Sequence, residues 1–128
     1  MNIWMIPNSI AIGLLSLIVI GNTYCGDVEI LSAEFHKSND GHWSVSVTLK
    51  HADTGWDHYA DNWRVLDADG NVLGNRVLHH PHVDEQPFTR SLSGVTIEEE
   101  ISAVYIEAHD KQHGWTANRL KVQLPATQ

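Results

Sequence analysis

The stretch His42-Trp43-Ser44-Val45-Ser46-Val47-Thr48-Leu49-Lys50 decides the fold class. Its apolar side chains occupy every second position, and serine, threonine or lysine follows each of them. Successive side chains of a β-strand point to opposite faces, so this alternation is typical of a strand with one buried face. The stretch therefore predicts a half-buried β-strand.

Six further segments also read as short β-strands. Turn-forming residues separate them, and Asp69-Gly70-Asn71 between two apolar runs is a hairpin signal. No long segment has a helical period. The predicted strands are 27–36, 42–50, 62–67, 72–78, 88–97, 102–108 and 118–124. Their number and spacing predict an all-β, immunoglobulin-like or fibronectin-like antiparallel sandwich of seven strands.

The first 25 residues differ from the rest, since they contain no Lys, Arg, Asp or Glu. The apolar run Ile10–Ile20 is shorter than the roughly 20 residues that a spanning helix needs. We therefore predict a signal peptide over residues 1–25, one domain over residues 26–128, and a periplasmic or secreted protein. The alternative is an uncleaved leader that anchors the protein in a membrane.

The composition limits which binding partners and metal ligands are plausible for this chain. The formal net charge is −8, so the chain repels nucleic acid and anionic membranes, and we expect no stable membrane insertion after leader removal. The only cysteine, Cys25, and both methionines, Met1 and Met5, belong to the predicted leader. The predicted domain therefore has no disulfide and no sulfur ligand for a metal.

Histidines are the most informative residues for function. If each strand reverses direction, the second–third, fourth–fifth and sixth–seventh strand links share one end of the sandwich. Seven of the nine histidines lie in or beside these links: His51, His58, His79, His80, His82, His109 and His113. Loops at one end of a rigid sandwich commonly carry function.

The pattern predicts a metal site at this end. His80 and His82 lie on one face of an extended segment that Pro81 stiffens, and Glu85 follows. His58 and His113 would join from neighbouring links. Imidazoles with an open coordination position are typical of catalytic Zn²⁺ or of Cu²⁺ sites. The alternative is a set of solvated or structural histidines.

Three more residues are candidates for ligand binding. Trp56 and Trp115 each follow a glycine in a link, where they would stack on a flat ligand or cap the core. Arg90 would bind an anion or brace nearby carboxylates. Trp63 opens a predicted strand, and we expect it in the core.

Two resemblances add to this interpretation. Gly74, followed after five residues by His80-Pro81-His82-Val83-Asp84-Glu85, resembles the first cupin motif, which implies a small metal-binding barrel as the alternative fold. Its glutamate comes one residue early, and His113 lacks the lead of the second cupin motif. The segments 55–63, 80–90 and 113–115 resemble small secreted bacterial proteins without an assigned role, which implies a secreted sandwich.

The leading hypothesis is a secreted or periplasmic protein that binds Zn²⁺ or Cu²⁺. The first alternative is a metal-dependent hydrolase or oxidoreductase at the same site, with Glu85 as the base. The second is a module that binds carbohydrate or an adhesion partner through the tryptophans. The third is an interaction domain that responds to pH through its histidines.

Overall fold

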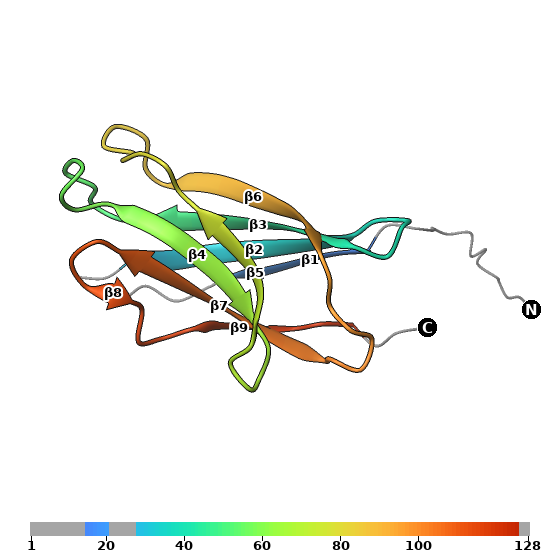
Figure 1. Cartoon of the computed structure of the whole chain (residues 1–128). Coiled ribbons are helices and arrows are strands. Elements are labelled where there is room, and N and C mark those ends of the chain that lie inside the picture. The colour runs from blue at the N-terminus through green and yellow to red at the C-terminus, as the bar shows by residue number, and fades with distance from the viewer. Residues whose placement is uncertain (1–14, 21–27, 126–128) are drawn as a thin grey trace, which may run out of the picture.

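The computed structural model describes residues 15–20 and 28–125, and these residues form strands and connecting links without a helix (Figure 1). The strands are β1 (Leu15–Ile20), β2 (Glu29–Lys37), β3 (Trp43–Lys50), β4 (Ala60–Leu66), β5 (Val72–Val77), β6 (Phe88–Val95), β7 (Ala103–Asp110), β8 (Gly114–Trp115) and β9 (Leu120–Gln123).

Two antiparallel sheets make up the fold. The first has the order β1-β2-β3-β6, and the second has the order β5-β4-β7, with both β8 and β9 paired to β7. Among the described residues no strand pairing joins the two sheets, so the predicted sandwich is confirmed and the cupin-like barrel is wrong. All seven predicted strands are present, as β2 to β7 and β9.

The pairing of β5 distinguishes this sandwich from a constant-type immunoglobulin domain. There the fourth strand joins the sheet of the first, second and fifth strands. Here β5 continues the hairpin with β4, with Asn62 opposite Val77 and Val65 opposite Gly74. The tight Asp69-Gly70-Asn71 turn, with a left-handed φ of 88° at Gly70, therefore keeps β5 in the second sheet.

The core lies between the sheets, where the alternating side chains of β3 point. Val45, Val47 and Leu49 have no exposed surface, and Trp43 is also buried. Across from them Trp63 of β4 is 1% exposed, which confirms its predicted core position. Burying one such large apolar side chain contributes about 1.5–3 kcal/mol, so the alternating apolar residues of β3 make a large contribution to the stability of the sandwich.

The second half of the apolar run in the predicted leader forms β1 at the edge of the first sheet. It pairs with β2 from Leu15 opposite Lys37 to Ile20 opposite Ser32, and Leu17 and Val19 pack against the core. The rest of the predicted leader lies outside the described residues. Cleavage after residue 25 stays a prediction, and it would leave β2 at the sheet edge. No helix within residues 15–20 and 28–125 is long and apolar enough to cross a membrane.

The links that carry the histidines meet at one end of the sandwich, as expected from strand alternation. Figure 1 shows the β3–β4, β5–β6 and β7–β8 links together at the end opposite the β6–β7 link. Asp53 of the β3–β4 link accepts a hydrogen bond from the backbone N–H of His82 in the β5–β6 link, and His51 Nε2 lies 3.1 Å from Asp110 Oδ2 at the end of β7, so the three links lie close together.

Candidate metal centre

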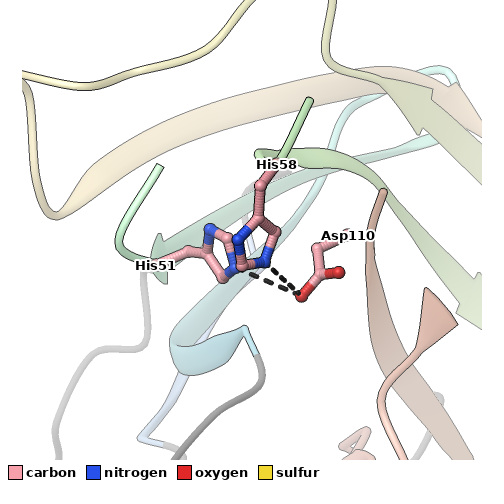
Figure 2. Close-up of side chains that lie close together, drawn as sticks. All are labelled: His51, His58 and Asp110. Carbon is pink, nitrogen blue, oxygen red and sulfur yellow. Dashed lines mark hydrogen bonds and ion pairs between the residues drawn. The ribbon is translucent and has the colours of Figure 1, made fainter. Parts of the chain in front are cut away.

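Asp110 is the centre of a cluster of imidazoles. It ends β7, and its Oδ2 atom lies 3.1 Å from His51 Nε2, 3.6 Å from His58 Nε2 and 2.9 Å from His113 Nδ1. Figure 2 shows the rings of His51 and His58 directed at this oxygen. His51 and His58 come from the β3–β4 link, Asp110 from the end of β7 and His113 from the β7–β8 link, so the cluster depends on the fold.

The Asp110 carboxylate is held in its ionised form. Burial alone would raise its pKa, but the backbone N–H and the side chain of His113 and the backbone N–H of Gln112 bond to it and hold the pKa at about 2. Both backbone groups donate to Oδ1. The second oxygen, Oδ2, is therefore a charged acceptor that faces only imidazoles among the contacts described above.

His51 is oriented by a second carboxylate. Its Nδ1 lies 2.6 Å from Asp53 Oδ1, and because an ionised carboxylate only accepts, Nδ1 is the donor. In the neutral ring Nε2 then carries a lone pair that faces Asp110 Oδ2. Two acceptors at 3.1 Å repel each other unless the ring is protonated or a cation lies between them. Metal-bound histidines usually have this carboxylate partner on the other ring nitrogen.

The Nε2 atom of His58 is available to bind a cation. It is buried and has no hydrogen-bond partner within the described part of the chain. Leaving such a group unpaired costs about 1–3 kcal/mol. The ring packs edge-on against His51, with centroids 4.8 Å apart, and lies 5.1 Å from the ring of His113. A cation shared with Asp110 would satisfy this nitrogen.

The spacing of the donor atoms fits a metal ion. His51 Nε2, His58 Nε2 and Asp110 Oδ2 all lie within 4.8 Å of one another. Donors at about 2.0–2.1 Å from tetrahedral Zn²⁺ are about 3.3 Å apart, so two of the observed separations need changes of only a few tenths of an ångström. Within the described part of the chain, His51, His58 and Asp110 are the group of three potential metal ligands whose donor atoms lie this close to one another.

Asp53 connects the histidine cluster around Asp110 to the β5–β6 link. Its side chain is fully buried, and Oδ1 accepts from His51 and from the backbone N–H of Ala60 at 3.0 Å. Its Oδ2 accepts from the backbone N–H of His82 at 2.8 Å. One carboxylate thus fixes the ring of His51 and the positions of two links.

The predicted ligands fall into two groups. His58 and His113 lie in the cluster around Asp110. His80 and His82 lie together in the β5–β6 link, with ring centroids 4.6 Å apart. Glu85 is in the same link, 3.3 Å from Arg90. The structure therefore divides the five residues predicted to share one ion between two neighbouring places.

His82 is engaged by other side chains. Its ring stacks on Phe88 at 3.9 Å, and its Nε2 lies 2.9 Å from Arg90, which can only donate. Its Nδ1 is buried, without a hydrogen-bond partner in the described residues, and is 3.9 Å from Asp53 Oδ2. Burial and the charge of Arg90 lower the pKa of His82, so the ring is neutral at pH 7. His80 is exposed.

The predicted stacking residues differ in exposure. Trp56 is 65% exposed and packs edge-on against Tyr59. Trp115 is half-buried, and the guanidinium of Arg64 covers its ring at 3.7 Å from the centroid. Arg90 contacts both Glu85 and His82, which is the bracing role considered for it.

Sequence reasoning missed Asp110 and Asp53 as site residues and placed His51 only at a link edge. Two local signals were available. Asp110 directly precedes the histidine-bearing link and has His113 three positions later, and Asp53 lies two positions after His51. Carboxylates this close to histidines are candidates for a mixed nitrogen and oxygen ligand set.

The fold and the cluster define a class: a β-sandwich domain with a histidine and carboxylate centre where its links meet. No family model matches the chain, and no solved structure matches it. It is similar to a protein of Halomicrobium mukohataei named "Putative lipoprotein", with 42% identity over 77 residues. The match covers 60% of this chain and 37% of that protein, so the chain spans little more than a third of its relative.

Proposed function

We propose that the protein binds one divalent transition metal ion, Zn²⁺ or Cu²⁺, through His51, His58 and Asp110, with His113 as the fourth residue of the centre. The observation that carries this proposal is the convergence of three imidazole nitrogens on Asp110 Oδ2, with His58 Nε2 buried and otherwise unpaired. A bound cation would neutralise the carboxylate of Asp110 and be coordinated by the Nε2 lone pairs of His51 and His58.

The donor set favours metal binding over catalysis. Imidazole and carboxylate suit Zn²⁺ and Cu²⁺, and the described residues contain no thiolate to select softer ions. His51, His58 and Asp110 supply three donors, and His113 Nδ1 would complete a tetrahedral shell on exchanging its bond to Asp110 for the ion. Four protein donors are typical of structural zinc sites, whereas catalytic zinc keeps one position for water. We therefore propose storage, transfer or sensing of the metal.

Metal titration of the purified chain, after treatment with chelator, tests this proposal. We expect one Zn²⁺ or Cu²⁺ per chain by elemental analysis. His51→Ala combined with His58→Ala should weaken binding at least about 100-fold, more than the loss of an outer hydrogen-bond partner of a ligand.

The matched control for the metal titration is His79→Ala combined with His80→Ala. It removes two exposed imidazoles from the same end of the molecule. Its affinity should stay within about twofold of the wild type. A wild type that takes up neither ion, or a control pair that loses binding as strongly, would reject this set of ligands.

We also propose that the domain is exported. The charge-free first 25 residues support this location, and the name of the relative refers to a lipoprotein. When the full chain is expressed in a bacterium, we expect it in the envelope or medium fraction, and N-terminal sequencing should find a start near Gly26. Recovery of the intact chain from the cytoplasmic fraction would contradict this prediction.

A further inference from the structure

A second candidate site lies beside the metal centre. An open depression of about 560 Å³ separates the β3–β4 link, which contributes Gly55 and Trp56, from residues 80–85 of the β5–β6 link. None of His51, His58 and Asp110 lines it. Its volume lies within the range of about 300–1,000 Å³ that is common for ligand sites.

The depression contains exposed apolar surface. Trp56 is 65% exposed and Val83 is 53% exposed, and both belong to its wall. The ring of Trp56 contacts Tyr59 at a centroid distance of 5.7 Å, with the two planes nearly perpendicular, so most of the indole stays open to solvent. Tryptophan is the best aromatic partner for a cation because its face is electron-rich.

Among the described residues, the depression is lined by two carboxylates and by no lysine or arginine, and the nearby Lys111 lies over the ring of Tyr59 rather than that of Trp56. Asp84 and Glu85 are both exposed carboxylates in the wall. Among the described contacts, Arg90 pairs with Glu85 but not with Asp84, and it also donates to His82. His82, buried below, is neutral at pH 7 because burial and Arg90 lower its pKa. With a formal net charge of −8, the whole chain adds to this negative potential.

We propose that this depression binds the guanidinium or ammonium group of a basic side chain from a partner polypeptide. The cation would lie over the indole of Trp56 and pair with Asp84 and Glu85. Because the depression is open to solvent, a long basic side chain can enter while its backbone stays outside. A neutral sugar would use the indole but not the carboxylates, and an anion would meet repulsion.

Nuclear magnetic resonance of the ¹⁵N-labelled chain tests the proposal directly. The probe is the peptide acetyl-Gly-Gly-Arg-Gly-Gly-amide, and its control contains citrulline, which has the same shape without the charge. The indole N–H signal of Trp56 is assigned from its absence in Trp56→Phe. We expect a saturable shift of this signal with the arginine peptide, and a much smaller one with citrulline.

Amino-acid substitutions distinguish a specific binding site from non-specific electrostatic attraction to the negatively charged protein. In Trp56→Ala, which lacks the indole signal, binding is followed through the backbone N–H signals of residues 82–85, and it should weaken roughly 2- to 5-fold, as expected for one exposed cation–π contact. Asp84→Asn with Glu85→Gln should weaken it further. The matched control, Glu98→Gln with Glu99→Gln, changes the net charge equally at the opposite end, where both are exposed. That pair should bind like the wild type.

Three results would overturn the proposal. Equal shifts with the citrulline peptide would show that the charge is not recognised. Equal loss in the control pair would show only long-range attraction. Shifts with neutral sugars but not with the arginine peptide would assign the depression to carbohydrate. Repeating the titration in chelator should give the same affinity, because none of His51, His58 and Asp110 lines the depression.

Discussion

Asp53→Ala should lower the free energy of unfolding by about 3–5 kcal/mol, as expected when one partner of a buried ionic network is removed. The fully buried carboxylate accepts from His51 Nδ1 and from the backbone N–H groups of Ala60 and His82. Without it, three buried donors lose their acceptor, and two links lose their common anchor. Urea unfolding at pH 7 in chelator measures the stability without any contribution from bound metal.

The same substitution should also weaken Zn²⁺ binding about 10- to 100-fold, because the ring of His51 loses the partner that fixes its tautomer and direction. Asp57→Ala is the control, since Asp57 is an exposed carboxylate of the same link. It should change stability by no more than about 0.5 kcal/mol. If the two variants unfold at the same urea concentration, Asp53 does not hold the links together.

The sandwich was predictable because its signal is local. The alternation in β3 and the Asp69-Gly70-Asn71 turn each depend on neighbouring residues, and both features are present as expected. Two strands escaped prediction for different reasons. β8 has two residues, too few to show a period, and β1 belongs to an apolar run whose composition indicates a leader. Short apolar runs do not reveal by period alone which structure they form.

The candidate site was predictable only in outline. Strand alternation brings the histidine-bearing links to one end, and that was enough to include His58 and His113. It could not show that Asp110 Oδ2 meets His51, a residue 59 positions away in sequence. The direction of each side chain within a link depends on packing, as with His82, which turns onto Phe88 and Arg90.

Acid should remove a stabilising contribution that belongs to Asp110. Its pKa is about 2 in the folded protein, against an ordinary value of 3.8. The difference corresponds to about 2 kcal/mol of stability, since one pKa unit is about 1.4 kcal/mol. Because the folded pKa is the lower one, this contribution is complete above about pH 5. It decreases as the pH falls from about 5 towards 2, where the folded carboxylate also takes up a proton.

The measurement that tests this pH dependence is the urea unfolding of metal-free wild type and Asp110→Asn between pH 7 and pH 3. Asparagine keeps an oxygen that can accept from Gln112 and His113, but it carries no charge to lose. At pH 7 we expect the variant to be less stable by about 2 kcal/mol, and the gap should narrow as the pH approaches 3. Asp57→Asn should follow the wild type throughout. If stability depends on pH in the same way for the wild type and for Asp110→Asn, the hydrogen bonds to Asp110 do not depress its pKa. A permanently ionised Asp110 would then no longer support a bound cation.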